Sequence, residues 1–261
     1  MIRKLFAEQR ALMVSGALFL ALFVGLAIVA PFDSVEVMGI NRWIKPMKFA
    51  SSIAIYLWTL AVFLYFIDGR ERAKNLIARG TIAMMIGEIF LIVMQAARGT
   101  TSHFNMSSAF DGAVFSLMGL LITINTLLAG YLLFLYFRAK VALPDSIVWG
   151  IRFGIVLLIL ASVEGGFMSA HLGHGVGAAD GGAGLTFVNW STRGGDLRVA
   201  HFVGLHALQL VPLFAWTLER FRIRAATLLT TIFAALYFAA FTGVFIQALL
   251  GRPLLSTLFA G

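Results

Sequence analysis

The sequence has no cysteine and little charge, and both absences limit what the protein can be. Without cysteine the chain has no disulfide, no thiolate metal ligand and no cysteine nucleophile. Only 12% of the 261 residues are charged, whereas a typical soluble domain has about 25%. The chain also lacks the alternation of apolar and polar residues that is typical of membrane β-barrels. These absences argue against a soluble domain and against an outer-membrane barrel.

Long apolar runs recur along the whole chain and predict a polytopic bundle of membrane helices. Hydrophobic residues make up 60% of the sequence, and the mean hydropathy is +0.92. A helix needs about 20 residues to cross the hydrocarbon core. Seven runs reach that length, at about 11–30, 48–67, 80–98, 112–137, 148–170, 197–218 and 225–249. The first run is too long for the core of a cleaved signal peptide. We therefore expect an all-α fold and a single integral membrane domain over residues 1–261.

The basic residues are distributed unevenly between alternate connectors. Thirteen of the 20 Lys and Arg residues lie in the N-terminal segment and in the connectors on the same side. Because cytoplasmic connectors are enriched in Lys and Arg, we expect a cytoplasmic N-terminus and a C-terminus outside. The net charge of +8 then reflects orientation in a lipid bilayer and gives no reason to expect nucleic acid binding. The pattern suits a multi-pass protein of a bacterial-type inner (plasma) membrane.

Histidines and misplaced cations gather on the predicted outer side. All five histidines lie on or near it: His103, His171, His174, His201 and His206. The other seven cations lie on that side, against the positive-inside bias: Arg42, Lys45, Lys48, Arg98, Arg193, Arg198 and Arg252. Ionisable groups inside membrane spans are candidate functional groups by default. The sequence therefore predicts a functional site at the outer face.

The preferred hypothesis is a haem- or metal-binding redox protein. Two histidines from different helices would ligate one b-type haem, or three would hold a transition metal such as Zn or Cu. The preferred ligands are His206 with His103 or His174. The haem carboxylates would pair, by charge-assisted hydrogen bonds, with Arg98, Lys45, Lys48 or Arg198. This hypothesis accounts for the histidines and the cations together.

A second hypothesis is a zinc-dependent membrane hydrolase acting on a lipid or another anion. His103, His174 and His201 would hold a zinc ion that activates water. The general base would be a carboxylate: Asp180, Asp111 or Glu164. Lys45, Lys48 and Arg98 would hold the head of an anionic lipid or small molecule. The enzyme class thus stays open between an oxidoreductase and a metal-dependent hydrolase.

A third hypothesis is a proton-coupled transporter or a membrane sensor. Glu88, Glu164 and the histidines would then form a proton relay. Glu88 and Gln95 are seven residues apart, so they share one face of their helix. The simplest alternative is structural: polar groups would only link the helices, and Asp111 and Asp196 would be helix N-caps.

Familiar seven-span families do not match the residues. A rhodopsin needs a lysine in the last span for its retinal Schiff base, and 225–249 has none. Adiponectin-receptor-like zinc hydrolases use a His-x-x-x-His pair late in the chain. Here His201 and His206 are five residues apart, roughly 140° around a helix, so they do not face one ion.

Overall fold

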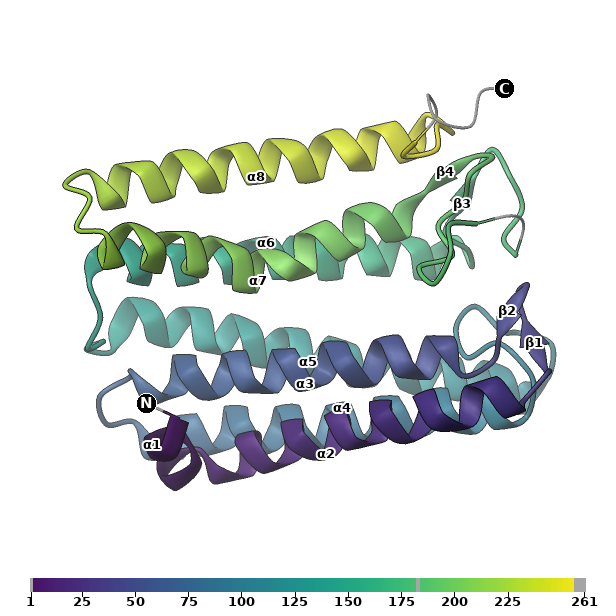
Figure 1. The fold of residues 1–261 in the computed structure, drawn as a ribbon, viewed down its shortest axis with the longest axis horizontal. Helices are drawn as coiled ribbons and strands as arrows, with labels where there is room; N and C mark the ends of the chain where they lie inside the picture. Colours follow the sequence, from purple (N-terminus) through teal and green to yellow (C-terminus); the bar gives the residue numbers. More distant parts are fainter. Residues whose placement is uncertain (1, 182–183, 256–261) are drawn as a thin grey trace. The chain divides into compact units, whose positions relative to one another are not determined.

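Nearly all regular structure in the computed structural model is helical, in the part of the chain that it describes, residues 2–181 and 184–255. Seven of the helices in this part are long and apolar enough to cross a membrane. They are α2 (Arg10–Val29), α3 (Ile44–Tyr65), α4 (Glu71–Ala97), α5 (Ala109–Arg138), α6 (Asp145–Ala170), α7 (Leu197–Arg220) and α8 (Ala226–Leu249) (Figure 1). The protein is therefore an all-α, multi-pass membrane protein with seven candidate spans.

The remaining elements are short, and all except one 3-10 turn at the end of the first span lie outside the seven spans. They are α1 (Ile2–Glu8), the 3-10 turn η1 (Ala30–Phe32), and the strands β1 (Glu36–Val37), β2 (Ile40–Asn41), β3 (Gly175–Val176) and β4 (Gly195–Asp196). The strands form two antiparallel pairs, β1 with β2 and β3 with β4. The pairing of Gly175 with Asp196 fixes the start of the long connector between α6 and α7 against its end.

The helices extend beyond the apolar runs, mainly at charged ends. Helix α4 begins at Glu71 instead of 80, and α3 begins at Ile44 instead of 48. Hydropathy underestimates these lengths because the first turns are charged and continue past the hydrocarbon core. Pro46 lies in the first turn of α3, where its missing N–H costs no helical hydrogen bond. Lys45 and Lys48 are consequently helical residues and do not lie in a connector.

The backbone contacts divide the chain into two compact units, called unit 1 (Met1–Ala142) and unit 2 (Leu143–Gly261). In unit 1, α2 packs mainly against α3, and α4 packs against α5 and α3. In unit 2, α6 packs closely against α7, and α8 packs against both. The expectation of a single domain over residues 1–261 stays a prediction.

The close contact of α6 with α7 depends on glycine. A Cβ atom on Gly154 would lie 2.9 Å from the carbonyl oxygen of Ala207, and one on Gly204 would lie 2.6 Å from the Cβ of Ala161. Small residues let membrane helices approach until their backbones touch. Further along the same interface, this close approach brings Glu164 of α6 next to His201 of α7.

Candidate functional site

Three ionisable side chains of unit 1 form a file, which we call the Lys45–His103–Glu88 file. Lys45 lies in the first turn of α3, His103 in the connector between α4 and α5, and Glu88 on α4. The Nζ of Lys45 is 3.1 Å from Nδ1 of His103. The Nε2 of the same ring is 3.8 Å from Oε1 of Glu88. The imidazole therefore lies between an ammonium group and a carboxyl group.

The neighbours of His103 determine which ring nitrogen carries hydrogen in the neutral form. An ammonium group can only donate, so Lys45 donates to Nδ1. The hydroxyl of Ser102 also lies 3.1 Å from Nδ1. The hydrogen of a neutral ring is then on Nε2, which faces Glu88. Because 3.8 Å exceeds hydrogen-bonding distance, a direct hydrogen bond requires the ring and the carboxyl group to move closer together.

The surroundings of this file are apolar. The rings of Phe49, Phe104 and Phe115 have their centroids 5.8, 6.1 and 6.4 Å from that of His103. Glu88 is only 4% exposed, and its Oε2 has no hydrogen-bond partner among the described residues. A carboxyl group inside a membrane is costly to keep charged unless it is paired. Glu88 is therefore suited to gaining and losing a proton.

A second polar cluster lies at the end of α4 and the start of α5. Arg98 forms an ion pair of 2.5 Å with Asp111 and also donates to Gln95. Gln95 donates to the same carboxylate at 2.8 Å. The expectation that Asp111 caps α5 is wrong: Ser108 is the N-cap and accepts from the Asp111 amide. Arg98, predicted to hold an anion, is already neutralised by Asp111.

Arg42, another cation of the predicted outer side, also has local partners. Arg42 forms an ion pair of 2.6 Å with Asp33, and the indole of Trp43 donates to the same carboxylate at 2.7 Å. The backbone amide of Val35 donates to the Asp33 carboxylate and lowers its pKa most, and the side chains of Arg42 and Trp43 lower it further. The pKa of Asp33 therefore lies below its ordinary value despite partial burial. Lys48 lies three residues after Lys45 on α3. Arg42 and Arg98 therefore each pair with an aspartate of their own, Asp33 and Asp111.

Unit 2 contains a second carboxyl–histidine pair. Nδ1 of His201 is 3.0 Å from Oε2 of Glu164 and 2.9 Å from the carbonyl oxygen of Ala161. Both oxygens accept when the carboxyl group is ionised, so Nδ1 carries the hydrogen and Nε2 is left as an acceptor. Glu164 is 6% exposed, and its Oε1 has no hydrogen-bond partner among the described residues. The pair resembles His103 with Glu88 in its chemistry.

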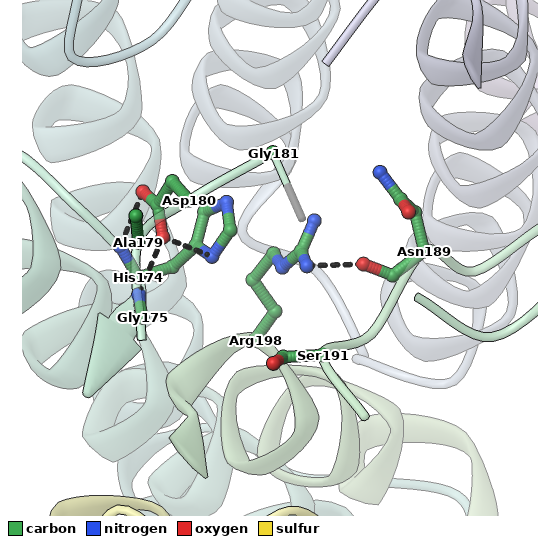
Figure 2. A pocket seen from close by; sticks show the side chains of 8 residues that line it. All are labelled: His174, Gly175, Ala179, Asp180, Gly181, Asn189, Ser191 and Arg198. Atoms are coloured by element: carbon green, nitrogen blue, oxygen red, sulfur yellow. Dashed lines mark hydrogen bonds and ion pairs between the residues drawn. The ribbon is translucent and has the colours of Figure 1, made fainter. Parts of the chain in front are cut away.

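Asp180 fixes the backbone conformation of the glycine-rich connector between α6 and α7. Its carboxylate accepts from the backbone amides of His174 at 3.1 Å and of Gly175 at 2.7 Å. It also lies 3.0 Å from Nδ1 of His174, as Figure 2 shows. A carboxylate with these partners fixes the backbone of the connector. The predicted role of Asp180 as a general base stays a prediction.

Asp196 and Arg198 lie at the other end of this connector, where α7 begins. Asp196 is the N-cap of α7, as expected, and accepts from the amide and the guanidinium of Arg198. Burial raises the pKa of Asp196, but the hydrogen bonds and charge of Arg198 outweigh burial, so the pKa lies below its ordinary value. A small hollow lies here (Figure 2), lined by His174, Gly175, Ala179, Asp180, Gly181, Asn189, Ser191 and Arg198. Its volume of about 10 Å³ suits one water molecule, and is far too small for haem.

Comparison with known proteins found no match for this chain. No protein-family model, no curated protein and no solved structure is similar enough to assign it to a family. The function is therefore argued from the residues and their geometry.

The two remaining histidines contact aromatic rings on their own helices. His206 lies 4.3 Å from the ring centroid of Phe202 on α7, and His171 lies 4.1 Å from that of Phe167 at the end of α6. Over residues 2–181 and 184–255, no group of three His, Asp or Glu residues is placed to hold a metal ion. The preferred metal ligands have three different surroundings: His103 in unit 1, His174 in the α6–α7 connector and His206 on α7. Their ligation of haem, Zn or Cu stays a prediction.

The sequence reasoning missed a polar group in the middle of unit 1. The hydroxyl of Tyr56 on α3 donates to Oδ1 of Asn125 on α5 at 3.3 Å. Thr81 of α4 is 1% exposed, and its hydroxyl has no hydrogen-bond partner among the described residues. The available signal was spacing, because Thr81, Glu88 and Gln95 follow one another at intervals of seven residues.

Proposed function

We propose that this protein is a membrane transporter or sensor that is driven by proton uptake at the Lys45–His103–Glu88 file. The observation that carries the proposal is the position of His103, with one ring nitrogen 3.1 Å from an ammonium and the other 3.8 Å from a buried carboxyl oxygen. Histidine is the side chain whose ordinary pKa allows it to exchange protons near neutral pH. The excess of basic residues on alternate connectors supports a bacterial-type inner membrane and a cytoplasmic N-terminus.

The proton step uses only groups of this file and water. The ammonium of Lys45 gives a proton to Nδ1 of His103, and the hydrogen on Nε2 passes to the carboxylate of Glu88. At one end of the ring an N–H bond of Lys45 breaks and an Nδ1–H bond forms, and at the other end the Nε2–H bond breaks and an O–H bond forms on Glu88. The ring ends as the other neutral tautomer. Lys45 then recovers its proton from water at the start of α3.

The Glu164–His201 pair of unit 2 supports the same function. It again joins a carboxyl group that is almost fully buried to a histidine that is partly exposed. Each of the two glutamates has one oxygen without a hydrogen-bond partner among the described residues. A purely structural pair would gain from bonding both oxygens, because an unsatisfied buried polar atom is destabilising.

Infrared titration of the protein in lipid vesicles tests the proposal. We expect the carbonyl band of a protonated carboxyl group to appear as the pH falls, and to vanish in Glu88→Gln. Glu36→Gln is the matched control, because Glu36 is exposed in β1. Proton flux, read from a pH-sensitive dye inside the vesicles, should fall at least tenfold in Glu88→Gln. A flux that is equal in the wild type and in Glu88→Gln, with no Glu88 band, would disprove the proposal.

A second candidate function is favoured by the orientation of His201. Its Nδ1 is bound by Glu164 and by the carbonyl of Ala161, which leaves Nε2 as an acceptor. Histidines that ligate haem or a metal ion are commonly held in this way. A reduced-minus-oxidised visible spectrum and a metal analysis of the purified protein test this candidate. Haem bands or bound Zn or Cu that His201→Ala removes would support it, and a flat spectrum without metal would end it.

A further inference from the structure

The proposed proton step leaves His103 in a tautomer that Lys45 cannot stabilise. After the step the ring carries its hydrogen on Nδ1, the nitrogen that lies 3.1 Å from Nζ of Lys45. Once Lys45 has recovered its proton, it is an ammonium group with three hydrogens and no lone pair. It therefore cannot accept a hydrogen bond from the new N–H, and this tautomer needs another acceptor.

Ser102 places an oxygen that can accept beside the same ring nitrogen. Its Oγ lies 3.1 Å from Nδ1 of His103, within hydrogen-bonding distance. A hydroxyl is both a donor and an acceptor, and its hydrogen rotates to suit its partner. Ser102 can therefore donate to Nδ1 when that nitrogen is bare and accept from it when it carries hydrogen. Because Ser102 is only 2% exposed, bulk water does not readily replace this contact.

The connector that carries Ser102 is fixed by Asn105, which is 7% exposed. The side-chain amide of Asn105 donates to the hydroxyl of Thr100 and to the carbonyl oxygen of Thr101, both at 3.0 Å. Its Oδ1 accepts from the amide and the hydroxyl of Ser107, at 3.1 and 2.7 Å. These bonds join the residues on both sides of the Ser102–His103 dipeptide, so its backbone has little freedom to move.

Phe104 packs against the imidazole from the other side of the dipeptide. Its φ of +58° lies in the left-handed region, which a bulky side chain rarely adopts. Its ring is edge-on to those of His103 and Phe115, with centroids 6.1 and 5.6 Å away. Backbone strain of this kind persists where the surroundings determine the conformation, and it clusters at functional sites. Phe104 therefore helps to keep the imidazole beside the Ser102 hydroxyl.

We infer that Ser102 is a positioning residue that keeps His103 hydrogen-bonded in both neutral tautomers, as a donor to Nδ1 before the proton step and as an acceptor from it afterwards. The inference rests on the proposed function and names the group that stabilises the product of its step. The proton that left Lys45 stays on Nδ1, and no covalent bond of Ser102 forms or breaks. The hydroxyl only turns about its Cβ–Oγ bond.

Replacing Ser102 tests this role in the intact protein in lipid vesicles. Ser102→Ala removes the hydroxyl, and we expect it to lower proton flux about tenfold, the effect of losing one hydrogen bond to the product tautomer. Ser102→Thr keeps a hydroxyl, and with it both the donor and the acceptor, so the flux should stay within about threefold of the wild type. Ser116→Ala is the matched control, because that hydroxyl bonds the carbonyl of Gly112 on its own helix.

NMR of the ring nitrogens in isotope-labelled protein reads the tautomer directly. The signals of His103 are identified as those that His103→Ala removes. At a pH where the infrared band of Glu88 has appeared, we expect the wild type and Ser102→Thr to show a neutral ring with its hydrogen on Nδ1. Ser102→Ala should lose that signal. A serine that only supported the connector would not change which nitrogen carries hydrogen.

The outcomes separate this inference from the proposed function. Wild-type flux in Ser102→Ala, with flux still blocked in Glu88→Gln, would overturn the inference alone, and so would equal tautomer signals in Ser102→Ala and the wild type. Unchanged flux in Glu88→Gln would remove the proposed function itself. Should Ser102→Ala fail to fold, Ser102→Cys keeps nearly the same shape with a weaker acceptor, and wild-type flux in that variant would also overturn the inference.

Discussion

His103 accepts a hydrogen bond from Lys45 on Nδ1, at 3.1 Å, and this contact orients the N–H of Nε2 toward a buried glutamate. The orientation depends on the lysine being a donor only. A neutral residue at position 45 would release the ring to adopt either tautomer. The direction of the proposed proton step is therefore determined at the first turn of α3.

Removing the imidazole of His103 should interrupt the Lys45–His103–Glu88 file while Lys45 and Glu88 stay in place. We expect His103→Ala to lower proton flux into vesicles about a hundredfold, the lower range of what a positioned acid–base group contributes. His171→Ala is the matched control, because that exposed ring contacts only its own helix end. Wild-type flux in His103→Ala would contradict the relay, whereas an equal loss in both variants would indicate a general effect of losing histidine.

Replacing Lys45 by Met should slow proton uptake more than it changes the final protonation of Glu88. The substitution keeps an apolar chain against Phe49 and removes the donor to Nδ1. We expect slower proton uptake after a rapid pH change, while the infrared band of Glu88 still appears at low pH. Lys74→Met is the control, because Lys74 pairs with Glu71 at the start of α4. Equal uptake rates in Lys45→Met and the wild type would exclude Lys45 as the proton donor.

Asp196 should make unit 2 sensitive to acid. Its folded pKa lies below the ordinary value of 3.8, so its contribution to stability is fully present above that value. The contribution is lost as the pH falls through the lower, folded pKa. Thermal unfolding measured as a function of pH should therefore show less acid dependence in Asp196→Asn than in the wild type. Identical acid dependence in the two proteins would show that Arg198 does not stabilise the charged form.

Glycine at the α6–α7 interface should matter for stability. An alanine at position 154 would place its Cβ 2.9 Å from a backbone carbonyl oxygen, and overpacking of this kind destabilises by about 1–3 kcal/mol. We expect Gly154→Ala to lower the unfolding temperature in detergent. Gly119→Ala, where nothing lies within 4 Å of the added carbon, should have little effect. A Gly154→Ala protein as stable as Gly119→Ala would mean that the two helices separate easily.

The membrane spans were predictable from the sequence because hydropathy is averaged over many residues. The helix ends were not predictable, because each end depends on only a few residues. Glu71 and Ile44 begin their helices well before the apolar runs. Asp196 caps α7 as its position next to an apolar run predicts, whereas Ser108 takes the place expected for Asp111. Side-chain type alone does not distinguish two residues that both suit an N-cap.

The pairing of the site residues depended on helix packing, which the sequence does not contain. The sequence predicted Glu88, Glu164, His103 and His201 as important residues. It could not predict that His103 pairs with Glu88 and His201 with Glu164, because each pair joins residues from different segments. The predicted cation cluster was also divided, since Asp33 and Asp111 each bind one arginine.

The three phenylalanines around His103 have a consequence for ion selectivity. A proton crosses an imidazole by exchanging bonds, so nothing larger than a hydrogen atom has to move. Sodium or potassium would have to pass the ring bodily and lose its hydration shell against Phe49, Phe104 and Phe115. In the proposed relay, an entrance built from one imidazole and three hydrocarbon rings would therefore exclude metal cations without any dedicated filter.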